Sequence, residues 1–146
     1  MRGVKRIIIH HSLTDDSRTL SWGAIRDNHK DTGWFDIGYH AGAEVVRDGI
    51  ECLYGRPDTV AGAHCAGHNH DSLGFCFVGD FDKQHPSDEL LEIACRRVIV
   101  PWLVYYGLNP EDIRPHSDFS EKTCPGKMFD MARLRQIAAE ILEEMQ

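Results

Sequence analysis

Short apolar runs and amphipathic stretches alternate along this chain, and each run predicts one secondary-structure element. Runs that are continuous and rich in β-branched residues, with turn residues at their ends, predict strands. The predicted strands cover Val4–His10, Tyr39–Arg47, Ile50–Tyr54, Leu73–Val78 and Ile113–His116. The second and third of these face each other across Asp48-Gly49, which is the strongest short signal for a hairpin.

Three other segments carry apolar residues at helical spacing. The first is Leu20–Thr32, with Gly33 in the position of a helix C-cap. Ser87 can cap a second helix, and Pro101 should kink that helix or end it early. The predicted inward faces of these two helices are Trp22, Ile25 and His29 in the first, and Leu91, Cys95, Val98 and Trp102 in the second.

Asp130 can cap a last helix, and its inner stripe is also apolar. The residues of this stripe are Leu134, Ile137, Ala138, Ile141 and Met145. Strands mixed with helices in this way predict an α/β fold, in which a mixed central β-sheet is flanked by helices within a single domain, residues 1–146. The order of the strands in that sheet does not follow from the sequence.

Composition narrows the function classes. The 146 residues carry a formal net charge of −7, which argues against a dedicated nucleic-acid binder. The longest apolar run, Val98–Tyr106, is far shorter than the roughly 20 residues of a membrane span. No secretory signal follows the basic start of the chain, so we expect a cytoplasmic protein without membrane contact. The odd number of cysteines, five, predicts reduced thiols rather than disulfides.

Nine histidines accompany these cysteines, and the combination suggests metal chemistry. His116 and Cys124 lie at the two ends of one segment and can both reach a zinc ion, which binds imidazole nitrogen and thiolate sulfur. Their spacing matches no common zinc finger, and a buried Cys near a surface His is the alternative. A third ligand could come from His10 or His11, of which only one should face the site, because neighbouring strand residues point to opposite faces.

Three further groups could contribute to the same site. The dense cluster Ala63–His70 could be a second metal site or, as we favour, a polar rim beside a cleft. Tyr39 could orient a substrate carbonyl or a water, although a Tyr at a strand edge more often serves packing. Lys122 lies two residues before Cys124 and could stabilise an oxyanion, although an isolated Lys is usually only solvated.

Four segments, in this order, resemble the type 2 zinc-dependent N-acetylmuramoyl-L-alanine amidases. That class includes the lysozyme-named amidases of short-tailed coliphages and the animal peptidoglycan recognition proteins. The resemblance runs from Ile7 to about Gly126. The segments that carry it are Ile8-Ile9-His10-His11-Ser12, Gly33-Trp34-Phe35-Asp36-Ile37-Gly38-Tyr39-His40, Gly62-Ala63-His64 with His68-Asn69-His70-Asp71-Ser72-Leu73-Gly74, and His116–Gly126.

The resemblance implies a role for each matching position. His10, His116 and Cys124 would bind one Zn²⁺ per chain, Tyr39 and Lys122 would be the active-site Tyr and Lys of the phage enzymes, and His64 would lie on the cleft rim as a substrate contact. Cys124 as a ligand also differs from the similar muropeptide-recycling amidases, which carry an Asp there. His11 is a departure, because the coliphage enzymes have a Cys at this position.

The implied activity is hydrolysis of the amide bond between N-acetylmuramic acid and L-alanine in peptidoglycan. The implied setting is a phage or prophage endolysin, a bacteriolytic enzyme that acts as a monomer and reaches the wall through a pore or at lysis. One alternative is a peptidoglycan-binding module without activity, as in several recognition proteins. Another is an added contact with RNA polymerase, which some coliphage relatives inhibit.

Overall fold

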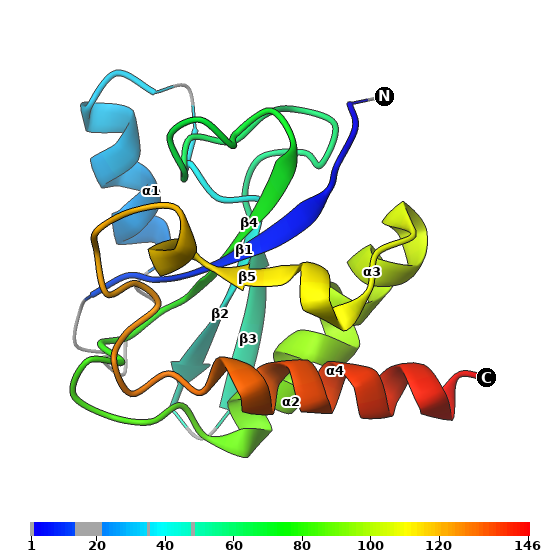
Figure 1. The fold of residues 1–146 in the computed structure, drawn as a ribbon. Helices are drawn as coiled ribbons and strands as arrows, with labels where there is room; N and C mark the ends of the chain where they lie inside the picture. Colours follow the sequence, from blue (N-terminus) through cyan, green and yellow to red (C-terminus); the bar gives the residue numbers. More distant parts are fainter. Residues whose placement is uncertain (1, 14–21, 35, 48) are drawn as a thin grey trace.

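A five-stranded mixed sheet forms the centre of the protein, seen in a computed structural model that describes residues 2–13, 22–34, 36–47 and 49–146. The strand order is β3-β2-β4-β1-β5 (Figure 1). The strands are β1 (Arg6–His11), β2 (Ala41–Val46), β3 (Gly49–Tyr54), β4 (Ser72–Phe77) and β5 (Ile113–Pro115). Only β2 and β3 pair antiparallel; the other neighbours are parallel. The predicted α/β class with a mixed sheet is confirmed.

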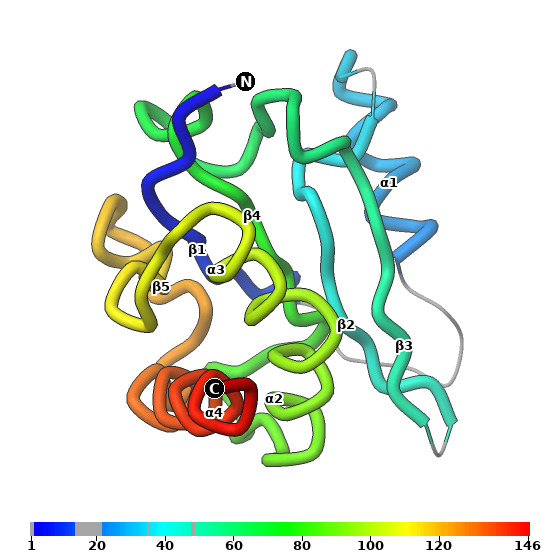
Figure 2. The backbone as a smooth tube through the Cα atoms, turned by 90° about the vertical axis from the view of Figure 1, so that its right-hand side faces the viewer, coloured from blue at the N-terminus to red at the C-terminus, as the bar shows by residue number. Residues whose placement is uncertain are grey.

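One face of the sheet carries the main hydrophobic core. Bulky side chains of β1 and β4, such as Ile7, Ile9, Phe75 and Phe77, point to this face and are fully buried. They pack against the helices α2 (Asp88–Ala94), α3 (Val100–Tyr106) and α4 (Met131–Glu144). Figure 2 shows these three helices on the side of the sheet opposite to α1 (Trp22–Asp31).

The opposite face, toward α1, carries small residues and leaves room above the sheet. Gly42 and Cys76 lie in one row with His10, and Gly74 lies beside Ile8 in the register of β1 and β4. Trp22 of α1 packs so closely on Gly42 that a Cβ there would lie 2.4 Å from the indole. Alternation along β1 therefore turns Ile7 and Ile9 into the core and His10 toward this roomier face.

Most predicted elements are present, with shifted ends. The first helix begins at Trp22, and residues 20 and 21 lie outside the described residues, as does Asp48 of the hairpin turn. Tyr39 and His40 precede β2 instead of belonging to it, and His116 begins a short 3₁₀ turn (His116–Asp118) after β5. Two further 3₁₀ and π segments are Pro110–Asp112 and Cys95–Ile99.

Two details of the predicted helices differ in the structure. The helix that contains Pro101 does not end early, which was one of the two expected outcomes, but continues to Tyr106. A π-helical turn, in which the Val100 N–H donates to the Cys95 carbonyl, interrupts the regular α-helical hydrogen bonding directly before the proline. Met145 is 61% exposed and lies beyond the end of α4, so it does not belong to the inner stripe. Ser87 and Asp130 cap their helices as predicted. Among the described residues, no helix is long and apolar enough to cross a bilayer.

Candidate metal centre and cleft

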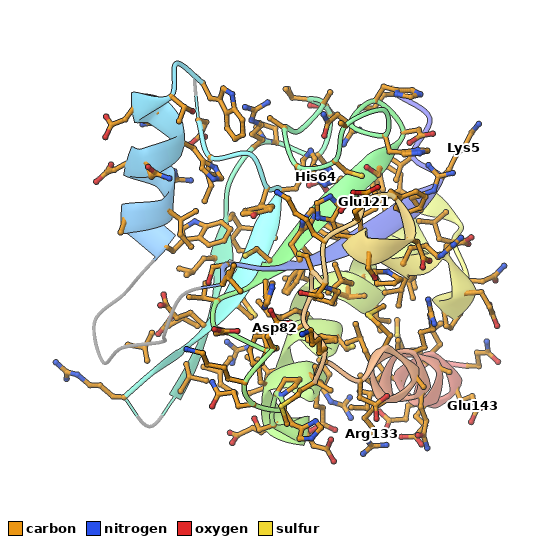
Figure 3. The ribbon with its side chains drawn as sticks, turned by 60° about the vertical axis from the view of Figure 1, so that its left-hand side comes forward. Lys5, His64, Asp82, Glu121, Arg133 and Glu143 are labelled. Atoms are coloured by element: carbon orange, nitrogen blue, oxygen red, sulfur yellow. The ribbon has the colours of Figure 1, made fainter. Side chains whose placement is uncertain are left out.

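A cleft of about 1000 Å³ opens on the α1 side of the sheet. Its walls come from the end of β1, the residues before β2, the loop before β4 and the segment after β5. All six residues that the sequence singled out line it: His10, Tyr39, His64, His116, Lys122 and Cys124. Figure 3 labels His64 and Glu121, which also belong to this lining.

Parallel pairing brings the three candidate metal ligands together. β1 and β5 are parallel neighbours, so the end of β1, with His10, and the end of β5, followed by His116, meet at the same edge of the sheet. The chain then loops back, and the Ser117 N–H donates to the Cys124 carbonyl at 2.8 Å. That bond closes the loop and places the Cys124 thiol beside His10.

The donor atoms of these three side chains suit a metal ion. One nitrogen of His10, one nitrogen of His116 and the Cys124 sulfur all lie within 4.8 Å of one another, the only such group of three among the described residues. His10 Nδ1 lies 3.8 Å from Cys124 Sγ. Tetrahedral zinc would hold nitrogen and sulfur ligands roughly 3.6 Å apart. Two imidazoles, one thiol and an open cleft beside them match a catalytic rather than a structural zinc site.

The protonation of the ligands favours a metal as well. Burial, followed by the nearby His64 and His116, holds the pKa of His10 well below its usual value, and burial with Lys122 lowers the pKa of His116. Both rings are therefore neutral at pH 7, as metal ligands must be. Burial raises the pKa of the Cys124 thiol to about 11, even though the His11 backbone N–H donates to its sulfur. A metal cation would offset this cost of forming a thiolate.

Tyr39 packs against His10, one of the candidate ligands, with ring centroids 5.1 Å apart. Burial, followed by the thiols of Cys76 and Cys124, raises the pKa of the Tyr39 phenol well above its usual value. The hydroxyl is therefore neutral at physiological pH and can donate a hydrogen bond. The His29 ring packs on Tyr39 at 5.7 Å and its Nδ1 accepts the Gly38 N–H, which fixes the backbone before Tyr39.

Lys122 is exposed on the loop that carries two of the ligands. Asp82 holds this loop in place, because its carboxylate accepts hydrogen bonds from the Thr123 hydroxyl at 3.1 Å and from the Lys127 N–H at 2.8 Å. The Lys122 N–H itself donates to Ser120 Oγ. The ammonium thus enters the cleft from a pinned loop, where its charge also lowers the pKa of His10, His116 and Cys124.

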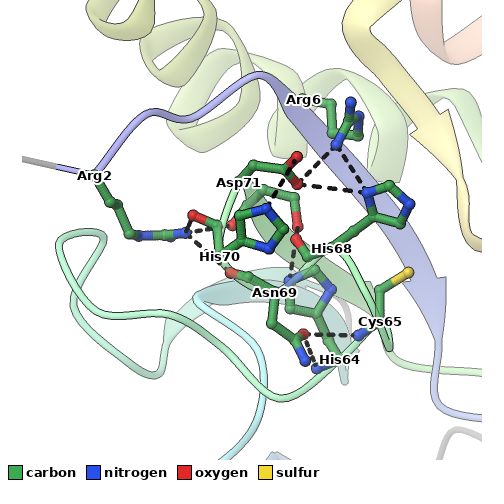
Figure 4. Close-up of polar contacts among 9 residues, drawn as sticks. Arg2, Arg6, His64, Cys65, His68, Asn69, His70 and Asp71 are labelled. Carbon is green, nitrogen blue, oxygen red and sulfur yellow. Dashed lines mark hydrogen bonds and ion pairs between the residues drawn. The ribbon is translucent and has the colours of Figure 1, made fainter.

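His64 lines the cleft, where it is partly buried, and contacts His10. Its Nδ1 is 2.9 Å from His10 Nε2, and its Nε2 is 3.3 Å from Ser72 Oγ. Asn69 Oδ1 accepts the backbone N–H groups of both His64 and Cys65, as the dashed lines in Figure 4 show. Burial, followed by the charge of a protonated His40, lowers the pKa of His64 to about 3.

The rest of the histidine cluster turns away from the metal centre. His68 and His70 flank Asp71, which also forms an ion pair with Arg6 at 2.7 Å (Figure 4). Arg2 donates to the carbonyls of Asn69, His70 and Ser72 and so ties the N-terminal segment to this loop. Among the described residues, His68 and His70 belong to no group of three side chains that could hold a metal ion, so no second metal site is found in this cluster.

His11 serves the opposite side of the sheet, as the alternation of strand residues predicted. Its Nδ1 accepts the Phe81 N–H at 3.1 Å, and the two rings stack at 6.3 Å. Of the two adjacent histidines, only His10 thus belongs to the group of three candidate metal ligands. Sequence reasoning gave no role to His40, Asn69 or Ser72, which hold His64 in place. The signal that could have found them is Gly74, since a glycine inside a strand marks the close approach of another group.

Known proteins share both the sequence pattern and the fold. A sequence model of the N-acetylmuramoyl-L-alanine amidase family matches residues 1–127. The chain is 36% identical over 132 residues to the endolysin of Enterobacteria phage T3, across 87% of this chain and 82% of the phage protein. The amidase LysC from Clostridium intestinale URNW superposes with a TM-score of 0.75 at 25% identity, across 97% of this chain and 87% of that one. A Drosophila PGRP-LB in complex with tracheal cytotoxin gives a TM-score of 0.74 at 26% identity, across 88% and 79% of the two chains.

Proposed function

The chain belongs to the N-acetylmuramoyl-L-alanine amidase family, and we propose that it works as a zinc enzyme whose metal is held by His10, His116 and Cys124. Its reaction is hydrolysis of the amide bond between N-acetylmuramic acid and L-alanine in peptidoglycan. The observation that carries the zinc assignment is the convergence of two imidazole nitrogens and one thiol sulfur within 4.8 Å beside an open cleft. When bound, zinc supplies Lewis-acid activation of the amide carbonyl and of the attacking water.

The chain's own residues supply the remaining functions of an amidase. The neutral hydroxyl of Tyr39, near the ligand His10, orients the attacking water by donating or accepting a hydrogen bond. The Lys122 ammonium stabilises the negative charge that develops on the carbonyl oxygen as the carbon becomes tetrahedral. His64 contacts substrate through its ring carbons, because both of its nitrogens already have partners.

The geometry favours an enzyme over a binding module without activity. A module that only held peptidoglycan would need the cleft but not a buried thiol whose pKa lies at about 11 beside two neutral imidazoles. His10 and Cys124 are buried there and His116 is partly buried, which is costly unless an ion is bound. The phage relatives are named endolysins, and we propose the same setting for this chain, a lytic enzyme of a phage or prophage.

The reaction is tested by product analysis on purified sacculi. We expect free peptides that begin with L-alanine, and glycan strands whose muramic acid keeps a free lactyl carboxyl group, both identified by mass spectrometry. Lys122→Ala should abolish most of this release, while Lys127→Ala is the matched control, since Lys127 is exposed just beyond the same loop and does not line the cleft. Sacculi that bind the protein but release no peptide would make it a binding module.

A further inference from the structure

The buried ligand His10 has a second ring nitrogen, and that nitrogen faces another histidine. His10 is 2% exposed, with Nδ1 toward the Cys124 sulfur and Nε2 toward His64 Nδ1 at 2.9 Å. A nitrogen that binds a metal carries no proton, so with Nδ1 as the ligand the His10 proton must lie on Nε2. His10 then donates and His64 accepts.

The direction of the remaining hydrogen bonds follows from this first one. His64 accepts at Nδ1, so as a neutral ring it carries its proton on Nε2 and donates to Ser72 Oγ at 3.3 Å. The Ser72 hydroxyl donates in turn to the His68 carbonyl at 2.5 Å. A carbonyl oxygen can only accept, so the chain of donors has a fixed end. Each member of the chain His10–His64–Ser72 is thereby held in one protonation state.

The His64 ring packs tightly against two glycines. A Cβ on Gly74 would lie 2.6 Å from the His64 Cγ, and one on Gly62 would lie 2.7 Å from its Cδ2. The ring meets the His10 ring edge-on, with centroids 5.0 Å apart and planes at 86°. Asn69 fixes the backbone from which the ring projects. Two glycines, a neighbouring ring and a capped backbone therefore leave the imidazole one orientation.

We propose that His64 is a positioning residue for the metal centre, which holds His10 in the tautomer and orientation that presents Nδ1 to zinc. The inference rests on the proposed zinc site and adds the residue that prepares it before the metal arrives. Removal of a partner of this kind weakens metal binding by about 10- to 100-fold in proteins. In this chain the loss is expected near the upper end, because His10 is buried and its Nε2–H would have no other acceptor in the described contacts.

The test is zinc affinity, measured by competition with a chromophoric chelator for purified protein with the metal removed. His64→Phe keeps a ring of similar size but cannot accept, and it should weaken zinc binding by about 10- to 100-fold. His64→Asn places an amide oxygen near the former Nδ1 and should recover most of that loss. His70→Asn is the matched control on the same loop, because the His70 side chain is 75% exposed, and it should bind zinc as wild type does.

A second measurement needs no variant and therefore does not depend on the folding of His64→Phe. Nitrogen-15 NMR of the metal-free wild-type protein distinguishes the two tautomers of each histidine. We expect a protected Nε2–H on His10 and an unprotonated Nδ1; a proton on Nδ1 would overturn the proposal. If wild type binds zinc and a folded His64→Phe variant binds it equally well, the proposed positioning role of His64 is wrong, whereas the proposed zinc site is unaffected. If wild type binds no zinc, both fall.

Discussion

Acid should destabilise the metal-free protein well above the pH range in which carboxylates titrate, because His40, which is buried, and His64, which is partly buried, are neutral in the folded state. His40 is 1% exposed, its Nδ1 accepts the Gly74 N–H at 3.0 Å and its Nε2 donates to the Val60 carbonyl at 2.8 Å. A second proton on this ring would point at the Gly74 N–H. Burial is the main reason that the pKa of His40 falls to about 4 and that of His64 to about 3.

The sign and size follow from linkage. Between the folded pKa and the unfolded value of about 6.5, the unfolded chain binds a proton that the folded chain does not, so stability falls as the pH falls. From pH 7 to pH 5 each ring contributes a loss of about 2 kcal/mol, or roughly 4 kcal/mol for His40 and His64 together. That is a large part of the 5–15 kcal/mol typical of a domain's total stability.

The assay is urea unfolding at pH 7, 6 and 5 with a chelator present, so that metal binding adds nothing to stability. His40→Gln removes one titrating group, and its stability should depend less on pH by about 2 kcal/mol over this range, whatever its stability at pH 7. His70→Asn, at an exposed position, should keep the wild-type pH dependence. Equal stability of the wild type at pH 7 and pH 5 would show that the fold does not hold His40 and His64 neutral.

Three further outcomes follow from the site. Lys122→Ala should lower kcat by about 100-fold or more without loss of zinc, because removal of an oxyanion donor has an effect of this size. Metal analysis and kinetics of the same sample check this, and a kcat near the wild-type value would remove Lys122 from the mechanism. Cys124→Ser should weaken zinc binding by more than about 100-fold, which exceeds the loss expected when a residue that only hydrogen-bonds to a ligand is removed. An unchanged zinc affinity in the chelator competition would exclude the thiol as a ligand. Gly74→Ala should lower the free energy of unfolding in urea by about 1–3 kcal/mol and also weaken zinc binding, because the new Cβ displaces His64. A variant with wild-type stability and full zinc affinity would contradict the close packing of His64 on Gly74.

Sequence patterns predicted the elements of this fold better than their arrangement. The β-branched run before His10 and the capping residues Ser87 and Asp130 are local signals, and each appears where it was expected. Strand order depends on which faces pack together, and no local pattern records this. The continuation of the helix past Pro101 also depends on tertiary packing, since the buried residues on both sides of the proline hold α2 and α3 on one sheet face.

The candidate site was predictable because its residues lie in four short motifs, each next to a strand end. Alternation along β1 predicted that only one of His10 and His11 would face the site, and only His10 lies in the group of three donors that could hold a metal. The sequence did not predict the hydrogen bond between His64 and His10, because it joins residues 54 positions apart. A spacing of that length carries no information until the fold brings β1 and the loop before β4 together.

The proposed reaction is cleavage of the muramoyl–alanine amide with a metal bound by His10, His116 and Cys124. Its most direct test is peptide release from sacculi by one protein sample before chelation, after chelation and after zinc is added back, with the zinc content measured at each stage. We expect about one zinc per active chain, loss of peptide release when the zinc is removed, and recovery of release when zinc is added back. Full release by protein shown to contain no metal would contradict it.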